Sequence, residues 1–127
     1  AIHGLTPEYL RTNGLPPLEA MQRMEAWLKE LDRRFVAAAW PSSFDSPYVG
    51  WYLQRFLGRN PLGHSAFDIA SYAMGLLRCT RVDLRRTLTQ AGLAPPTNPR
   101  PHHALHDAVE QGHLLANLLN HAGHPGR

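Results

Sequence analysis

Cysteine and long apolar runs are nearly absent from this sequence. Its single cysteine, Cys79, cannot form an internal disulfide and favours a reducing compartment. No apolar run approaches the roughly 20 residues that a membrane span needs, and no secretory signal is recognisable. These absences predict a soluble, cytoplasmic protein without a membrane partner.

Lysine is also scarce, so the positive charge of the chain is almost entirely guanidinium. Lys29 is the only lysine among 13 basic residues, against 10 acidic ones, and the formal net charge is +3. Arginine suits bidentate contacts with phosphate, but high-GC coding also enriches it. The bias alone is therefore weak evidence for nucleic-acid binding. A hydrophobic content of 43% in 127 residues predicts one globular domain over 1–127 with a modest core.

Helix-end signals and helical spacing of apolar residues predict an α/β chain made mainly of helices. Thr6 is expected to cap a short helical turn that ends at Gly14. The segment 94–103 contains four prolines and cannot form regular structure. Longer helices are predicted within 16–32, 41–58, 65–77 and 104–123. A further short helix is predicted within 83–93, ended by Gly92, and residues 124–127 are predicted to be a frayed tail.

Two of these helices carry more detailed expectations. In the first long helix, Glu25 and Lys29 are expected to pair on the outer face. In the next helix, Asp45 or Ser46 is expected to be the cap, with Pro47 in the first turn. An apolar stripe on the first long helix is expected to form core, and it comprises Leu18, Met21, Met24, Trp27, Leu28 and Leu31.

The strands are few. The unbroken apolar run at 34–40 is typical of a strand that is covered on both faces. A short extended segment leads to Asp68, which is expected to cap the following helix. An interior strand needs several neighbours, so we expect the other strands of the sheet to lie upstream of Ala1 or to come from another chain.

Histidines His102, His103 and His106 and the acid Asp107 crowd together where the proline-rich segment meets the last helix. Asp107 shares a meridian of that helix with Leu114 and Leu118, so its carboxylate is expected to be either a cap or a metal ligand. A zinc site is disfavoured because no cysteine is nearby and no His-Glu-x-x-His occurs. The residues of this helix that are expected to be buried are Leu105, Ala108, Val109, Gly112, Leu115, Ala116 and Leu119.

Residues 102–107, HHALHD, contain an H-x-A-x-x-D pattern that resembles the third motif of the DEDDh family of 3′→5′ exonucleases. FDSPYV at 44–49 resembles that family's second motif, in which an aspartate follows a central strand. HGLT at 3–6 and AFDIASYAMGLL at 66–77 resemble two further segments of the family. The third motif alone is a weak pattern, but four segments in the family's order over essentially the whole chain form a specific resemblance.

The resemblance implies a ribonuclease H-like α/β fold and hydrolysis of phosphodiesters with two divalent ions, Mg²⁺ or Mn²⁺. By position, Asp45 and Asp107 would be metal ligands, and His102 would be the general base. The implied substrate is single-stranded RNA or DNA, and a homodimer is a further expectation. Tyr48 is the candidate for stacking on a base, whereas Trp51 is expected to be core.

One part of the family's pattern is missing. The first motif, D-x-E, supplies two more carboxylates and occurs nowhere in this sequence. We therefore expect the chain to be the C-terminal two-thirds of an exonuclease domain and to be inactive alone. The alternative is a non-catalytic nucleic-acid or protein-binding module of the same fold, whose arginines would hold phosphates. The sequence leaves the choice between RNA and DNA open.

Overall fold

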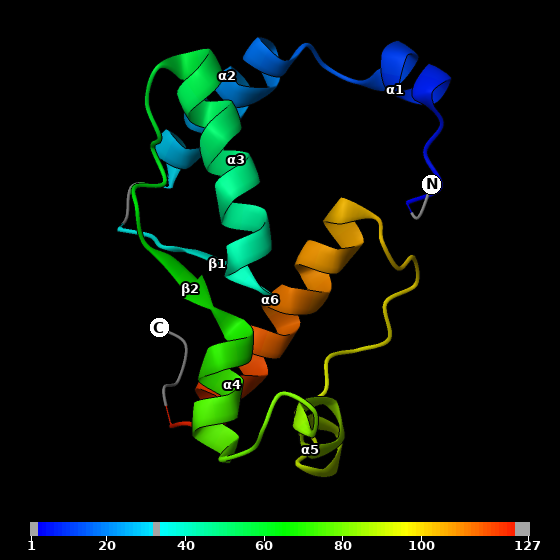
Figure 1. The fold of residues 1–127 in the computed structure, drawn as a ribbon, viewed down its shortest axis with the longest axis vertical. Coiled ribbons are helices and arrows are strands. Elements are labelled where there is room, and N and C mark those ends of the chain that lie inside the picture. Colours follow the sequence, from blue (N-terminus) through cyan, green and yellow to red (C-terminus); the bar gives the residue numbers. More distant parts are fainter. Residues whose placement is uncertain (1–2, 32–33, 124–127) are drawn as a thin grey trace. The chain divides into compact units, whose positions relative to one another are not determined.

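The computed structural model describes residues 3–31 and 34–123, so the predicted tail at 124–127 lies outside the described residues. The fold is mixed α/β and mostly helical (Figure 1). No helix in the described part is both long and apolar enough to span a bilayer. The elements are α1 (Pro7–Asn13), α2 (Pro17–Glu30), β1 (Ala37–Ala39), α3 (Ser42–Leu57), β2 (Ala66–Asp68), α4 (Ile69–Leu77), α5 (Leu84–Gln90) and α6 (Ala104–His121).

The chain divides into two compact units. The first unit takes its residues from 1–38 and 42–67 and contains α1, α2 and α3. The second takes its residues from 39–41 and 68–127 and contains α4, α5 and α6. The strands β1 and β2 pair in a two-stranded sheet, and each strand runs from the first unit into the second.

Two helix starts follow the predicted capping chemistry. The side chain of Thr6 accepts a hydrogen bond from the backbone N–H of Tyr9 at 3.1 Å, and α1 ends before Gly14. The carboxylate of Asp68 accepts one from the N–H of Ser71 at 2.7 Å, which starts α4. Each cap satisfies a backbone donor that has no partner within its helix, so both predictions are confirmed.

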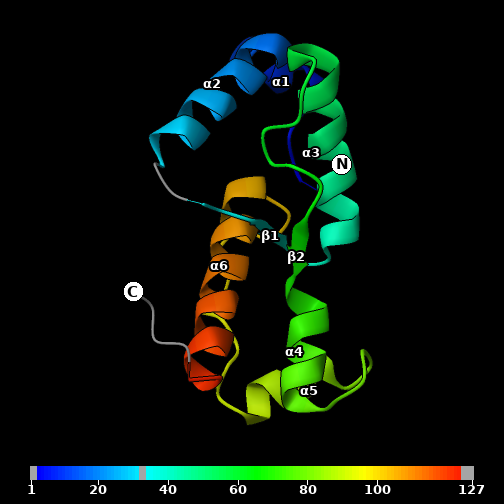
Figure 2. The same cartoon turned by 90° about the vertical axis from the view of Figure 1, so that its left-hand side faces the viewer.

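In the first unit, α2 packs against α3, and the two helix axes diverge from the end where they meet (Figure 2). Leu28 from α2 and Leu53 from α3 are its buried apolar side chains, with 6% and 0% of their surface exposed. The predicted core stripe on α2 is only partly buried, because Leu18 and Trp27 are 47% and 56% exposed. An apolar stripe wider than the surface of one partner helix leaves its edges in solvent, and α3 is the main partner of α2 among the described residues of this unit.

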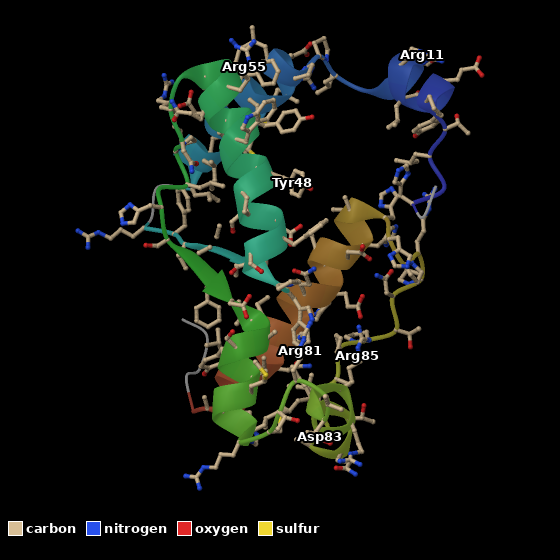
Figure 3. All side chains as sticks on the ribbon, viewed as in Figure 1. Arg11, Tyr48, Arg55, Arg81, Asp83 and Arg85 are labelled. Atoms are coloured by element: carbon tan, nitrogen blue, oxygen red, sulfur yellow. The ribbon has the colours of Figure 1, made fainter. Side chains whose placement is uncertain are left out.

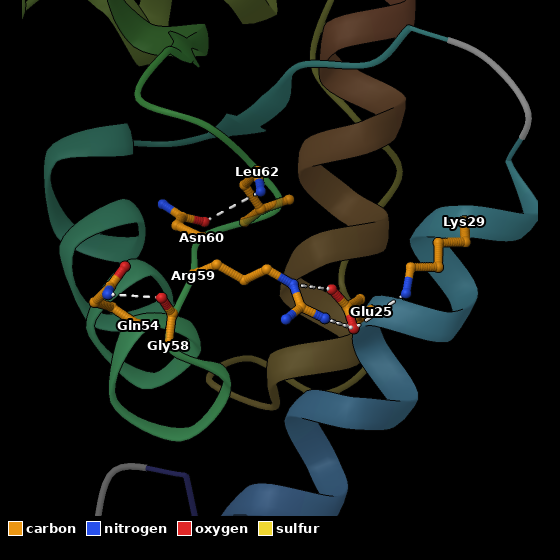
Figure 4. Close-up of polar contacts among 7 residues, drawn as sticks. All are labelled: Glu25, Lys29, Gln54, Gly58, Arg59, Asn60 and Leu62. Atoms are coloured by element: carbon orange, nitrogen blue, oxygen red, sulfur yellow. Dashed lines mark hydrogen bonds and ion pairs between the residues drawn. The ribbon is translucent and has the colours of Figure 1, made fainter.

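A partly buried ion pair joins α2 to the segment that follows α3, with Glu25 buried and Arg59 largely exposed (Figure 4). The Arg59 guanidinium donates from Nε and Nη2 to the two carboxylate oxygens of Glu25, each at 2.8 Å. Lys29 Nζ lies 3.3 Å from Glu25 as predicted, but Glu25 is only 9% exposed, so its expected place on the outer face is wrong. The bidentate hydrogen bonds from Arg59 lower the pKa of Glu25 below its ordinary value.

In the second unit, the apolar helix α4 contacts both α5 and α6 (Figure 2). The short segment 39–41 is held by α6, since the Trp40 N–H donates to Oε1 of Gln111 at 2.9 Å. The guanidinium of Arg81 lies 5.2 Å above the ring of Trp40, within range of a cation–π contact. The core of this unit comprises Ile69, Ala70, Ala73, Leu84, Leu88, Leu93, Leu114 and Leu118.

The predicted inner face of α6 is wrong. Leu105 and Val109 are 65% and 50% exposed, whereas Leu114 and Leu118 are 6% and 0% exposed. The helix carries leucines in adjacent pairs at 114–115 and 118–119, so periodicity alone favours two faces. The buried face of α6 is the one that contains Leu114 and Leu118, which is also the meridian of Asp107, and α4 is a helix that contacts α6 in this unit.

The predicted strand at 34–40 is present but shorter. Only Ala37–Ala39 pair with β2, and Phe35 and Val36 are 41% and 52% exposed. The expectation that this strand is covered on both faces is therefore wrong for the part of the chain that the structure describes. A two-stranded sheet lacks the neighbours that would bury such a strand.

Glu25→Gln should weaken the first unit at neutral pH, because Arg59 would lose its charged partner. Since the pKa of Glu25 is lowered, the contribution of the ion pair is fully present above the ordinary value of 4.5 and is lost as the pH falls through the lowered pKa. Urea unfolding from pH 7 to pH 3 should show a destabilisation that shrinks in acid. The exposed pair Glu19–Arg23, at 2.7 Å on the same helix, provides the control Glu19→Gln, which should change little.

The face of α6 that is buried can be tested by truncating one leucine on each side. Leu118→Ala should cost about 2–5 kcal/mol of unfolding free energy, because it leaves a cavity in a packed site. Leu105→Ala should cost roughly 0.5 kcal/mol or less, as for other exposed positions. Urea unfolding measures both. A larger cost for Leu105→Ala than for Leu118→Ala would contradict the burial described here.

Candidate active site

The segment that carries His102 and Asp107 is a turn followed by the first turn of α6. His103 is the N-cap residue, with an extended backbone, and Asp107 lies in the first helical turn. His102 has a positive φ of 67°, which is uncommon for a residue other than glycine. The structure thus places His102 outside the helix, on a loop, as the proline-rich sequence suggests.

Asp107 ties this loop to the helix. Its Oδ1 accepts a hydrogen bond from the backbone N–H of His102 at 3.1 Å and another from Nδ2 of Asn98 at 2.8 Å. Left-handed backbone costs about 1–2 kcal/mol for such a residue, whereas a hydrogen bond to a charged group contributes about 1.5–3 kcal/mol. The carboxylate of Asp107 therefore offsets the conformational cost at His102.

A second carboxylate, Glu110, lies one turn further along α6. Its Oε2 accepts a hydrogen bond from the same Asn98 Nδ2 at 2.9 Å. Two like charges three residues apart on a helix repel each other by a few tenths of a kcal/mol. The shared amide donor offsets that repulsion, and the positive end of the helix dipole favours Asp107 in the first turn. Glu110 is therefore a partner of the loop, and its carboxylate is not simply solvated.

The neighbouring histidines contact each other. The rings of His103 and His106 lie edge to face with their centroids 5.0 Å apart. Nδ1 of His103 is buried and has no hydrogen-bond partner among the described residues. Neither histidine bonds to Asp107 through its ring within the described part of the chain, so the contact between the loop and the acid involves the backbone of His102 and the side chain of Asn98.

Asp45 belongs to the first unit. It lies in the first turn of α3, which begins at Ser42, so the predicted cap at Asp45 or Ser46 is wrong. Pro47 consequently lies inside the helix and not in its first turn. The side chain of Asp45 is partly buried, and this burial raises its pKa. A carboxylate in such a position is destabilised unless positive charge reaches it.

Tyr48 lies one turn after Asp45 on α3 and is 62% exposed (Figure 3). Its ring centroid lies 5.4 Å from that of Phe44, which is equally exposed. Trp51 is 58% exposed, so its prediction as a core residue is wrong. With Met21 and Met24 of α2, Tyr48 also lines a shallow apolar groove within the first unit.

The chemistry of these acids fits part of a site for a hard divalent cation, which prefers carboxylate oxygens. Oδ1 of Asp107 takes both hydrogen bonds from the loop, and Oδ2 takes none from the described residues. Within 3–31 and 34–123, no group of three or more His, Cys, Asp or Glu side chains could hold a metal ion. The described chain thus offers single ligands, not a complete set.

Sequence reasoning did not identify Asn98 or the polar role of Glu110. Asn98 precedes a proline in a segment that was expected to be irregular, and asparagine is a common turn residue. That signal predicts a turn, but it does not predict which side chains the amide meets. The three-residue spacing from Asp107 to Glu110 puts both acids on one side of α6, and this spacing was the available clue.

The chain is similar over most of its length to a known protein. No protein-family profile matches the chain. The chain is 33% identical over 117 residues to a protein of Escherichia coli named 3′-5′ DNA exonuclease Cap18. The similarity covers 90% of this chain and 62% of the relative, so the chain spans less than two-thirds of that protein's length.

Proposed function

We propose that this chain is part of a metal-dependent 3′→5′ exonuclease of the DEDDh type, acting on single-stranded DNA, with a ribonuclease H-like fold. The observation that carries the proposal is the 33% identity over 117 residues to a protein named 3′-5′ DNA exonuclease. The H-x-A-x-x-D pattern supports the proposal, because its histidine and aspartate are joined by a hydrogen bond. The name of the relative favours DNA over RNA.

Each site residue has a role that suits its surroundings. Asp107 would bind a divalent cation through Oδ2, since the loop engages Oδ1. Asp45 would bind a cation in the first unit, where partial burial disfavours its unneutralised charge. Bound Mg²⁺ or Mn²⁺ would stabilise negative charge on the oxygens of the phosphodiester.

His102 would accept the proton of the attacking water. Imidazole titrates near neutral pH and is therefore a suitable general base. The side chain is exposed on a loop, where it can approach a bound 3′ end, while its backbone is held by Asp107. Asp107 would thus both bind a cation and hold the backbone of the general base, His102.

Two carboxylates do not complete a four-carboxylate site. The sequence holds no D-x-E, and the relative is longer than the region that this chain matches. We propose that the missing pair comes from outside these 127 residues. A preparation of these residues alone should then lack nuclease activity.

The strand of DNA would be held by arginines and aromatic rings. Arg85 and Arg86 lie in α5 and Arg81 lies just before it, and Arg86 pairs with Asp83 at 2.6 Å. The guanidinium of Arg81 is in contact with Trp40, and Arg85 lies in the first turn of α5 (Figure 3). Such donors bind phosphates in a salt-dependent manner. Tyr48 would stack on a base.

A second candidate function rests on the same arginines. Without the missing carboxylates, the fold would bind nucleic acid and not cleave it. The two functions separate in one assay, because both predict binding that weakens with salt, whereas only the exonuclease shortens a 5′-labelled strand from its 3′ end.

Asp107→Asn should abolish exonuclease activity in the intact protein, because the amide cannot supply a charged ligand to a cation. Its Oδ1 can still accept from the loop, so the fold and the position of His102 should persist. Shortening of 5′-labelled single-stranded DNA in the presence of Mn²⁺ measures the effect. EDTA should stop cleavage by the unaltered enzyme. Glu8→Gln, an exposed acid in the first turn of α1, is the matched control. Undiminished cleavage by Asp107→Asn would exclude the assigned ligand.

Asp45→Asn should remove activity and yet stabilise the metal-free protein at neutral pH. Because burial raises the pKa of Asp45, the charged form is less favourable in the folded chain, and stability falls as the pH rises through that range. The gain should vanish in acid, below the ordinary value of 3.8, where both states hold a proton. Thermal unfolding at pH 7 and pH 3 measures it. A lower melting temperature than the unaltered protein at pH 7 would contradict this account of Asp45.

A further inference from the structure

Asn98 contacts the acids of the candidate site but has no role in the proposed function. It lies in the proline-rich segment, and its Nδ2 donates to Oδ1 of Asp107 at 2.8 Å and to Oε2 of Glu110 at 2.9 Å. Both hydrogens of one amide group thus engage carboxylates of α6. Asn98 is itself partly buried, so these contacts are partly shielded from solvent.

The other end of the same amide shapes the loop. Oδ1 of Asn98 accepts a hydrogen bond from the backbone N–H of Arg100 at 2.9 Å, which is an Asx turn. The carbonyl of Arg100 then accepts from the N–H of His103 at 3.2 Å. One side chain therefore sets the turn that leads into His102 and also contacts the acid that holds His102.

A residue that only forms a turn needs its acceptor and not its donor. The two bonds from Nδ2 are additional to the turn, and both act on acids. They draw Oδ1 of Asp107 towards the loop, on the same side as the His102 N–H. This arrangement leaves Oδ2 of Asp107 without a hydrogen bond from the described residues.

We propose that Asn98 is a positioning residue for the exonuclease site, an inference that rests on the proposed function. It orients the carboxylate of Asp107 so that one oxygen holds the loop of His102 and the other is presented to a divalent cation. It also holds Glu110 beside Asp107 in spite of their like charge. Outer partners of metal ligands commonly change metal affinity or activity 10–100-fold when they are removed.

The experiment compares Asn98→Asp and Asn98→Ala with a matched control in the intact protein. Asn98→Asp keeps the acceptor of the turn but loses the donor, whereas Asn98→Ala loses both. Asn117→Ala is the control, because Asn117 also donates its amide within the same unit, to the carbonyls of Leu93 and Ala94 at 3.2 and 3.5 Å. It lies ten residues, roughly 15 Å along α6, beyond Asp107.

The first measurement is hydrogen exchange of the His102 amide by NMR in metal-free protein. Exchange should accelerate about tenfold or more in Asn98→Asp and in Asn98→Ala, and should stay within about twofold in Asn117→Ala. The latter variant reports any general loosening of the unit. An exchange rate in Asn98→Asp within about twofold of the unaltered protein would overturn the proposal, since Asn98 would then be a turn residue alone.

The second measurement is Mn²⁺ binding, followed by the relaxation of water protons. Asn98→Ala should weaken binding roughly 10–100-fold, and kcat at saturating Mn²⁺ should fall while KM for DNA stays within about twofold. Unchanged Mn²⁺ affinity in Asn98→Ala would overturn the positioning role. If the unaltered protein bound no Mn²⁺, the proposed function would fail, and the exchange rates would still decide whether Asn98 holds the loop of His102.

Discussion

The candidate site depends on the hydrogen bonds that the carboxylate of Asp107 accepts from the loop before α6. Its Oδ1 receives the backbone N–H of His102 and the amide of Asn98, so one oxygen joins the proline-rich loop to the first turn of α6. Without that acceptor, the left-handed backbone at His102 would have no compensation for its conformational cost. The same acid has a second oxygen that the described residues leave without a hydrogen bond. One carboxylate therefore has both parts of the proposed role, because Oδ1 of Asp107 holds the loop and Oδ2 is the proposed ligand for a cation.

The two compact units differ in the size of their cores and in the side chains that they expose. The second unit has the larger core, with eight buried apolar residues around α4, α5 and α6, and this core fixes the helix that carries Asp107. The first unit buries Leu28 and Leu53 and holds α2 to the end of α3 through the ion pair of Glu25 with Arg59. It also exposes large aromatic side chains on α3, beside Asp45. In the proposed function, a cation would neutralise the partly buried carboxylate of Asp45, and a base of the DNA strand would cover the exposed ring of Tyr48.

The sequence predicted the parts of this structure that depend on neighbouring residues. The caps formed by Thr6 and Asp68 were predictable, because each hydrogen bond joins a side-chain oxygen to a backbone N–H only three residues along the chain. The last helix and the loop before it were also predicted, since prolines exclude helix and apolar spacing favours it. The sequence failed where burial decided the outcome. The buried face of α6 passes through Leu114 and Leu118 and not through Leu105, and Glu25 is inside because Arg59, which lies far along the chain, reaches it. Asn98 is the same case, since its turn was predictable and its contact with Asp107 and Glu110 was not.

One measurement tests the central claim most directly, which is that Asp107 shares its oxygens between the loop and a cation. Crystals of the intact protein soaked in Mn²⁺ would reveal bound metal by its anomalous scattering. The account predicts a manganese peak beside Oδ2 of Asp107, with Oδ1 still hydrogen-bonded to Asn98 and to the His102 N–H. A peak bound to Oδ1 with the loop released, or manganese held elsewhere while Asp107 stays without metal, would contradict it.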